Sequence, residues 1–199
     1  MGIFQYDKQH TELLSQRDVR LGDFISRKGH ISRRVFEDIF EGLCYNIVNQ
    51  QLSMKACETL WGKLISELHE ITPESCSDAA RLKGCGLSQS KAECIAECAR
   101  RYISGEINAD KLRIMDDAEV ITALTSIKGI GAWTAEMTLI FCLERMDVLS
   151  LSDYGIRKGL SLLHGIDIKD IGAMKKYKEL YSPCGTVASF YLWEAAREL

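Results

Sequence analysis

Apolar residues along this chain recur mainly at spacings of three and four positions, which is the period of a helix with one buried face. In segment 118–125, for example, Val120, Ile121 and Leu124 lie on one side. The chain has only two prolines and few alternating β-branched residues, which leaves little evidence for strands. The pattern therefore predicts an all-α protein, with helices at about 8–16, 19–28, 35–50, 53–69, 75–81, 88–104, 116–125, 131–144, 154–164, 170–180 and 185–197.

The most informative interruption lies between the helices expected at 116–125 and 131–144. The connecting residues, Ile127-Lys128-Gly129-Ile130-Gly131, contain too much glycine to continue either helix. Glycine permits a tight turn and the close approach of another backbone. The N–H groups that begin the second helix would also favour a phosphate oxygen. The spacing alone favours a plain corner between two helices, closed by a glycine cap.

A short connector after this turn brings Asp153 to the start of the helix expected at 154–164. An aspartate directly before a helix is most often its N-cap. The same residue also presents a carboxylate close to whatever the turn binds. Together, the two features suggest chemistry on a nucleotide.

Composition limits the alternatives. The chain has 199 residues, 46% of them hydrophobic, so it can bury a good core as one compact unit or as two lobes. It contains no apolar run long enough to span a membrane, and its polar start, MGIFQYDKQH, does not resemble a signal peptide. We therefore expect a soluble intracellular protein with no membrane partner.

The net charge of −3 means that attraction to nucleic acid must be local. Lys128 and Lys91 rank highest as candidates for a phosphate contact, because both lie in turn motifs.

Eight cysteines are many for a chain of this length. They are Cys44, Cys57, Cys76, Cys85, Cys94, Cys98, Cys142 and Cys184. A disulfide framework is not expected without a secretory signal. Cys94 and Cys98 have the spacing of two metal ligands on a helix, but no second close pair completes a zinc site. Buried thiols that pack as small apolar groups are the favoured interpretation.

Four blocks of sequence carry a family resemblance. They are IKGIGAWTAEM at 127–137 with D-Y-GIRKGL from 153, IVNQQLSMKA at 47–56, GLSQSKA at 86–92 and VASFYLW at 187–193. Together they resemble the helix–hairpin–helix DNA glycosylase superfamily, and most closely its 3-methyladenine DNA glycosylase II branch. The blocks fall in the order that the family has, which makes the set far more specific than any single block.

The resemblance implies an all-α fold of two helical lobes with an active-site cleft between them. One lobe would hold residues 36–145, including the hairpin and a loop that wedges into DNA. The other would combine residues 1–35 with 146–199 and carry the catalytic carboxylate. Several family members have an additional N-terminal β domain, and none is expected here, because the first motif already begins near residue 47.

The resemblance also assigns the chemistry. Asp153 matches the catalytic carboxylate, which would stabilise positive charge on the sugar while the N-glycosidic bond breaks. Trp133 occupies the position at which bifunctional relatives have a lysine that nicks the strand, so the enzyme would be monofunctional and would use water. The walls of the base pocket would be Trp133, Tyr154, Trp193 and Met137, the last standing where relatives often have another aromatic residue. Burial in the core remains an alternative for each aromatic residue.

DNA contacts follow by the same resemblance. Gln51 or Leu52 would fill the gap left by the flipped base, although a helix-capping turn closed by Ser53 fits the pattern equally well. The backbone contacts would come from Lys128, Gly129, Gly131 and Lys91. The family also implies a monovalent cation, sodium or potassium, bound through the carbonyls of Thr125, Ile127 and Ile130. No other cofactor is expected, and only Cys184 lies beyond Cys142, so an iron–sulfur cluster near the C-terminus cannot form.

The sequence thus indicates a glycosylase that excises alkylated purines from damaged double-stranded DNA. It would act as a monomer, in the cytoplasm or in a eukaryotic nucleus. A glycosylase for deaminated or oxidised bases is the alternative enzyme, because the fold hosts several specificities. A non-catalytic DNA-binding module is a third interpretation, but such a module needs neither the carboxylate nor the aromatic residues. Three departures affect the substrate range: Leu149–Ser152 lacks the family's proline and glycine, Cys184-Gly185 stands where relatives often have Tyr-Arg, and the overall charge is acidic.

Overall fold

The structure, a computed structural model, describes residues 2–198. These residues divide into two compact units. Phe36–Leu143 forms the central unit, and the residues up to Val35 together with those from Glu144 form the terminal unit. The division expected from the sequence ended the central lobe at residue 145. Each unit has its own core.

The terminal unit is built almost entirely of helices. Its elements are β1 (Gly2–Ile3), α1 (Lys8–Arg17), α2 (Val19–Lys28), β2 (Arg34–Val35), α10 (Tyr154–His164), α11 (Ile171–Met174), α12 (Lys176–Tyr181) and α13 (Gly185–Glu198). The two short strands pair antiparallel, with Gly2 opposite Val35 and Ile3 opposite Arg34. The predicted all-α class is therefore confirmed, apart from this small pairing.

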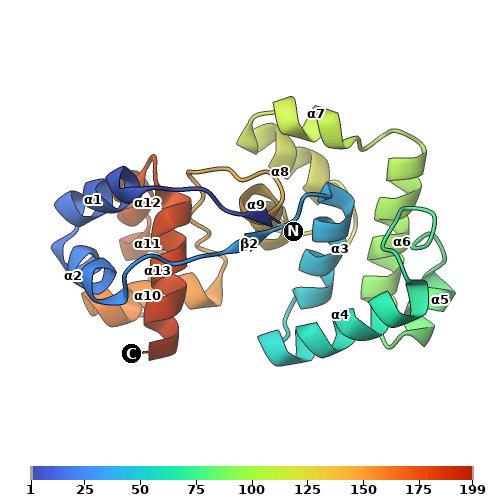
Figure 1. Ribbon diagram of the computed structural model, residues 1–199, viewed down its shortest axis with the longest axis horizontal. Helices are drawn as coiled ribbons and strands as arrows, with labels where there is room; N and C mark the ends of the chain where they lie inside the picture. The colour runs from blue at the N-terminus through green and yellow to red at the C-terminus, as the bar shows by residue number, and fades with distance from the viewer. Residues whose placement is uncertain (1, 199) are drawn as a thin grey trace. The chain divides into compact units, whose positions relative to one another are not determined.

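Helix α13 is the core of the terminal unit and lies against α10 (Figure 1). Its residues Phe190, Tyr191 and Leu192 are fully buried. The two helices approach closely because position 159 of α10 is a glycine: a Cβ there would overlap the carbonyl group of Leu192. Lys158 on the same helix donates a hydrogen bond to the Ala196 carbonyl at 2.5 Å, so α10 is also tied to the C-terminal part of α13.

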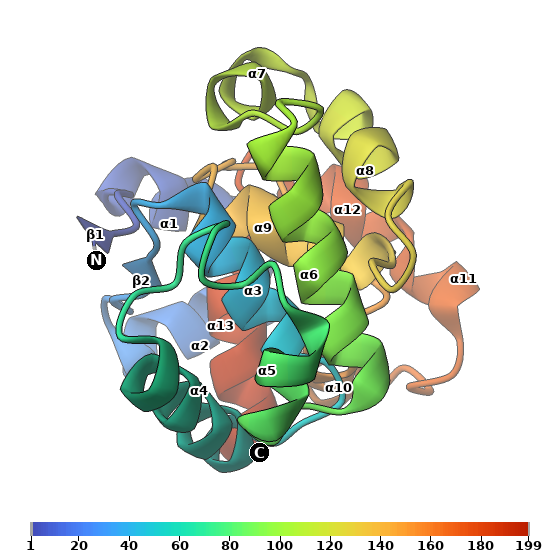
Figure 2. The same cartoon turned by 90° about the vertical axis from the view of Figure 1, so that its right-hand side faces the viewer.

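The central unit consists of helices around α3. Its elements are α3 (Ile39–Asn49), α4 (Met54–Leu68), α5 (Ala79–Gly84), α6 (Gln89–Ile103), α7 (Ala109–Ile114), α8 (Asp117–Thr125) and α9 (Ala132–Phe141). Helix α3 contacts α4, α6 and α9, and Figure 2 looks onto this group from the side of α6. Leu43, Ile47 and Val48 on α3 are fully buried, as a helix enclosed by three others requires.

The expected helices differ from the observed ones at four places. The segment expected at 75–81 is a turn followed by α5, because Asp78 caps the helix through hydrogen bonds from the N–H groups of Ala80 and Arg81. Helix α7 was not expected, because it is too short to show a periodic pattern. The helix expected at 170–180 is divided into α11 and α12. The one expected at 35–50 begins only at residue 39, after β2.

All eight cysteines are buried free thiols, as the sequence interpretation expects. Within residues 2–198, none of the helices has the length and apolar character that a membrane span needs.

Candidate active site and DNA-binding loops

Asp153 is the N-cap of α10. Its Oδ1 accepts a hydrogen bond from the backbone N–H of Ile156 at 2.8 Å. The same oxygen accepts a second hydrogen bond, at 2.9 Å, from Nε1 of Trp193. The N-cap expected from the residue pattern is therefore present, and the carboxylate has a further partner that the sequence did not reveal. Two donors on one oxygen hold the half-buried carboxylate in a defined direction.

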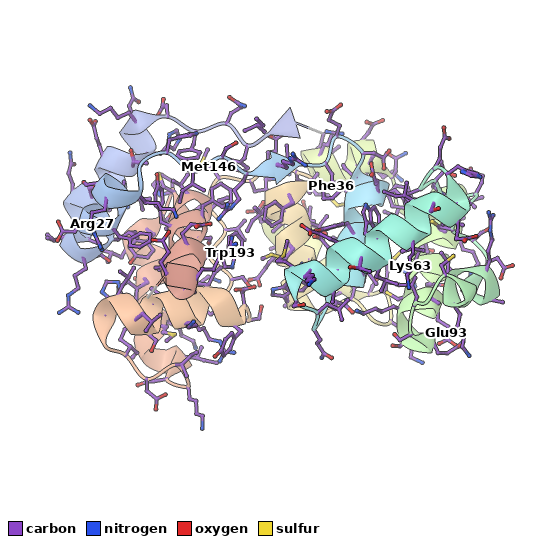
Figure 3. The ribbon with its side chains drawn as sticks, turned by 60° about the horizontal axis from the view of Figure 1, so that its bottom comes forward. Arg27, Phe36, Lys63, Glu93, Met146 and Trp193 are labelled. Carbon is purple, nitrogen blue, oxygen red and sulfur yellow. The ribbon has the colours of Figure 1, made fainter. Side chains whose placement is uncertain are left out.

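Trp193 lies on α13 and is half-buried (Figure 3). Its ring stacks against that of Phe190, with ring centres 6.1 Å apart and planes inclined by 28°. Gly155 leaves room for the indole, because a Cβ at that position would lie 2.8 Å from Cδ1 of Trp193. The sequence placed Trp193 in the wall of a base pocket, and the structure adds that its N–H group orients the carboxylate of Asp153.

Tyr154 follows Asp153 directly and is the first residue of α10. Its side chain is 64% exposed, which is unusual for a large aromatic residue in a folded protein. The core alternative is therefore wrong for this residue. An exposed aromatic ring beside a carboxylate is suited to stacking on a base.

The hairpin connects α8 to α9 in the central unit. Ile127 and Ile130 are buried, and a hydrogen bond of 3.0 Å from the N–H of Ile130 to the carbonyl of Ile127 closes the turn. Gly129 has a φ of 100°, a conformation that L side chains rarely adopt, and a Cβ there would lie 2.9 Å from Sγ of Cys94. Lys128, by contrast, is exposed.

Gly131 is the N-cap of α9 and is exposed. It has no side chain with which to cap the helix, and a Cβ built on it would meet no described atom within 4 Å. The start of α9 is therefore open on the side of Gly131, where a ligand oxygen can approach. This geometry fits the predicted phosphate contact, because the positive end of the helix dipole lies at the same place.

The carbonyls expected to bind a monovalent cation lie in or beside this turn. Thr125 is the last residue of α8, where a helix leaves carbonyl groups without an intrahelical partner. The carbonyl of Ile127 accepts a hydrogen bond from Ile130 and keeps one further lone pair. The donor set is therefore compatible with a weakly bound monovalent cation, which remains a proposal.

The loop between α3 and α4 holds the expected wedge residues. Gln51 is exposed and has a φ of 55°, which is uncommon for a residue other than glycine. Leu52 is 37% exposed. Ser53 caps α4 by accepting a hydrogen bond from the N–H of Ala56 at 3.3 Å. The capping turn is thus present, and it leaves both candidate wedge side chains exposed.

Gln50 in this loop and Lys91 on α6 have contacts that the sequence does not reveal. Nε2 of Gln50 donates to the Gly129 carbonyl at 3.0 Å and to Oγ1 of Thr134 at 2.9 Å. Nζ of Lys91 donates to the carbonyls of Val48 and Gln50, both at 2.8 Å. Burial lowers the pKa of this ammonium group. Two of the three N–H donors of Lys91 are therefore engaged at the C-terminal end of α3, and its expected phosphate contact stays a prediction that only the third donor could make.

The other two pocket residues lie on α9. Trp133 is half-buried in the first turn of that helix. Met137, in contrast, is 3% exposed and belongs to the core of the central unit. A methionine buried to this extent supports the helix packing. At most the edge of its side chain could contribute to the wall of a base pocket.

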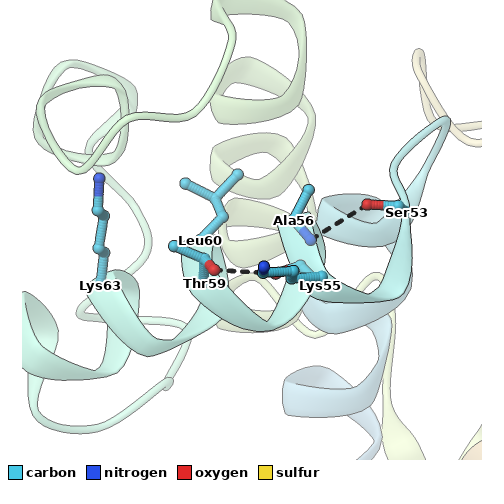
Figure 4. Close-up of a pocket in the computed structure, with 6 residues that line it drawn as sticks. All are labelled: Ser53, Lys55, Ala56, Thr59, Leu60 and Lys63. Atoms are coloured by element: carbon cyan, nitrogen blue, oxygen red, sulfur yellow. Dashed lines mark hydrogen bonds between the residues drawn. The ribbon is translucent and has the colours of Figure 1, made fainter.

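A shallow groove of about 410 Å³ runs along the outer face of α4, directly after the wedge loop (Figure 4). It is lined by Ser53, Lys55, Ala56, Thr59, Leu60 and Lys63. None of the residues expected to form the base pocket lies in it. The groove has two lysines and no acidic side chain in its lining, so its character suits a phosphate backbone better than a purine base.

Comparison with known proteins agrees with this geometry. The family model of the HhH-GPD superfamily of base excision DNA repair proteins matches residues 44–183, and the chain belongs to that superfamily. DNA-3-methyladenine glycosylase 1 of Schizosaccharomyces pombe is 35% identical over 165 residues, which cover 79% of this chain and 72% of that protein. The resemblance inferred from the four sequence blocks is thereby confirmed.

Solved structures show the same relationship. The DNA-3-methyladenine glycosidase of Bacillus halodurans is 33% identical, with a TM-score of 0.83 over 100% of this chain and 94% of that one. The 3-methyladenine DNA glycosylase of Schizosaccharomyces pombe in complex with abasic DNA is 30% identical, with a TM-score of 0.87 over 94% of this chain and 96% of that one.

Proposed function

We propose that this protein is a monofunctional DNA glycosylase that flips alkylated purines out of double-stranded DNA and hydrolyses their N-glycosidic bonds. The observation that carries the proposal is the carboxylate of Asp153, fixed by Ile156 and Trp193 beside an exposed aromatic ring. Relatives about one third identical over most of the chain are named 3-methyladenine glycosylases. Binding alone would not require an oriented carboxylate.

The reaction breaks the bond between C1′ of the sugar and the nitrogen of the base. The bonding electron pair leaves with the base, and positive charge builds on the sugar. Asp153 stabilises this charge and orients or deprotonates the water whose oxygen then bonds to C1′. The hydrogen bond from Trp193 keeps the carboxylate in place while the charge develops, so the group does not have to reorganise.

Cationic alkylated purines are the substrates that this chemistry suits best. A base that already carries positive charge leaves without a proton donor. It also stacks well on electron-rich rings, by about 0.5–2 kcal/mol per ring. Trp133, Tyr154 and Trp193 are the rings that would provide such stacking.

Single-turnover excision from matched duplexes tests the specificity. We expect 3-methyladenine and 7-methylguanine to be released faster than uracil and 8-oxoguanine. Faster release of a neutral base than of both cationic ones would favour the alternative, a glycosylase for deaminated or oxidised bases.

The proposal also predicts the product. Trp133 has no amine with which to form a Schiff base, so the strand should remain intact with an abasic site. A covalent protein–DNA adduct trapped by borohydride during excision would contradict the monofunctional assignment.

The partners follow from the same proposal. The hairpin would bind the DNA backbone through the N–H groups beginning at Gly131, with help from Lys128, and Gln51 or Leu52 would fill the gap in the duplex. A sodium or potassium ion on the hairpin carbonyls would strengthen the phosphate contact. The protein would act as a monomer on DNA within the cell.

A further inference from the structure

We propose that Gln50 is a positioning residue that holds the wedge loop (Gln50–Ser53) against the hairpin (Ile127–Gly131), so that the two DNA-contacting elements act as one rigid part. Its side-chain amide donates two hydrogen bonds across the gap between these loops, one to the Gly129 carbonyl at 3.0 Å and one to Oγ1 of Thr134 at 2.9 Å. This role rests on the proposed function, because it concerns how a base is flipped.

The Gly129 carbonyl requires a side chain with an N–H donor at this position. A backbone carbonyl can only accept, so the amide nitrogen of Gln50 must face Gly129. The second N–H of the same nitrogen reaches the hydroxyl of Thr134, in the first turn of α9. The two bonds therefore bracket Gly131, the residue at which the phosphate would be bound.

The backbone of the wedge loop is held from a second side. Lys91 on α6 donates to the carbonyls of Val48 and Gln50 at 2.8 Å, so residue 50 is fixed through its main chain and its side chain. The same helix contributes Cys94, which packs under Gly129 so closely that a Cβ there would lie 2.9 Å from its sulfur. Gln51, which has a positive φ, follows directly after this doubly held residue.

The consequence is a fixed distance between the hairpin, which would bind phosphate, and the wedge loop. Flipping a base requires the wedge to enter the duplex at a defined offset from the phosphates that the hairpin holds. If the loop were free, its ordering would have to occur during flipping and would lower the population of the flipped state. With the amide bonds in place, that ordering is completed when the protein folds.

The experiment compares Gln50→Ala with the wild type on two substrates that differ only in how much flipping costs. In the first, 7-methylguanine pairs with cytosine; in the second, it lies opposite an abasic site and is already unpaired. We expect single-turnover excision by Gln50→Ala to fall about tenfold on the paired lesion and by less than about twofold on the unpaired one, as the loss of two neutral hydrogen bonds would predict. Affinity for undamaged duplex should stay within about twofold of the wild type, because the hairpin itself is unchanged.

Three variants make the test specific. Gln89→Ala is the matched control: it removes an amide that bonds Glu93 on the exposed surface of α6, and it should behave as the wild type on both substrates. Gln50→Glu places a carboxylate against the Gly129 carbonyl and should be slower on the paired lesion than Gln50→Ala. Thr134→Val removes one of the two acceptors and should give a partial loss of the same kind, even if Gln50→Ala folds poorly.

Fluorescence of 2-aminopurine beside the lesion separates this inference from the proposed function, because it reports unstacking without requiring excision. We expect the wild type and Gln89→Ala to give an increase that Gln50→Ala lacks. Equal losses of Gln50→Ala on both substrates, or a full unstacking signal from it, would overturn the positioning role. No release of any alkylated purine by the wild type, with the fluorescence difference intact, would instead refute the proposed function alone.

Discussion

Nε1 of Trp193 donates a hydrogen bond of 2.9 Å to Oδ1 of Asp153, the same oxygen that caps α10 through Ile156 at 2.8 Å. The donor comes from α13 and the acceptor from the residue before α10, so one bond connects the two helices that dominate the terminal unit. Rotation of the carboxylate would break both bonds at once. The tryptophan therefore fixes the direction in which the carboxylate of Asp153 points.

Trp193→Phe tests this relationship, because phenylalanine keeps an aromatic ring but has no N–H donor. A hydrogen bond to a charged group contributes about 1.5–3 kcal/mol, so we expect excision to slow by roughly 10–100-fold. Single-turnover rates at saturating enzyme measure the chemical step separately from binding, and the affinity for DNA should change little. A rate equal to that of the wild type would show that the hydrogen bond has no role in catalysis.

Asp153→Asn should retain the fold and DNA binding but lose about 10²–10⁴-fold in excision, the range typical of removing one charge-stabilising group. Asparagine still caps a helix and still offers an oxygen to Trp193, so the change removes charge and little else. The measurement is release of 7-methylguanine under single-turnover conditions.

Asp170→Asn is the matched control, because Asp170 caps α11 of the same unit and accepts from the N–H of Ala173 at 2.9 Å. This variant should keep the wild-type rate. If Asp153→Asn folds and turns over normally, Asp153 is not the catalytic carboxylate.

The sequence alone is sufficient for the helical class, for the turn between α8 and α9 and for Asp153 as the N-cap of α10, because each has a local signature. Helical period is visible within one turn or two, and a Gly-x-Gly interruption followed by an aspartate can be recognised from neighbouring residues. The short helix α7 has no such signature, since its six residues around one buried leucine show no period.

Contacts between distant segments were not accessible in this way. Nothing near Lys91 indicates that its ammonium group meets carbonyls 41 and 43 positions earlier in the chain. The bond from Gln50 to Gly129 spans 79 positions, and the one from Trp193 to Asp153 spans 40. A single sequence shows which groups can form hydrogen bonds, whereas the fold decides which of them meet.

The two hairpin glycines are predicted to behave differently when each is replaced by alanine. At Gly131 the new methyl group would meet no described atom, so the protein should stay folded while the methyl group blocks the approach of phosphate. Affinity should then fall to a similar extent for all duplexes, because backbone contacts carry no sequence information. A loss confined to certain flanking sequences would contradict this interpretation.

At Gly129 the methyl group would instead meet Cys94 at 2.9 Å, and the backbone has a positive φ. Gly129→Ala should therefore lower the melting temperature, by the effect of about 1–2 kcal/mol that a strained backbone position typically has. Comparing melting curves of the two variants separates a glycine needed for folding from one proposed to bind phosphate. Equal destabilisation by both would show that Gly131 is also required for folding.

Asp18 contacts the C-terminal end of α10, the helix that Asp153 caps at its N-terminus. Its Oδ2 accepts from the hydroxyl of Tyr181 at 2.5 Å and lies 3.2 Å from Nε2 of His164, the last residue of α10. Burial raises the pKa of this carboxyl most strongly, but hydrogen bonds from His164, Tyr181 and the N–H of Leu21 together lower it to about 2. The ordinary value is 3.8, so folding favours the ionised form.

The lowered pKa of Asp18 makes the stability of the protein depend on pH. A folded-state pKa below the unfolded one stabilises the protein at pH values above about 4, and this contribution is lost as the pH falls from about 4 to about 2. The shift corresponds to roughly 2 kcal/mol, because Asp18 is well buried and each pKa unit is worth about 1.4 kcal/mol.

Asp18→Asn should therefore unfold in urea with roughly 2 kcal/mol less free energy near neutral pH, and its difference from the wild type should shrink towards pH 2. Asp170→Asn, an exposed cap in the same unit, should differ little from the wild type across this range. A deficit of Asp18→Asn that stays constant down to about pH 2 would show that the ionised carboxylate is not what stabilises this end of α10.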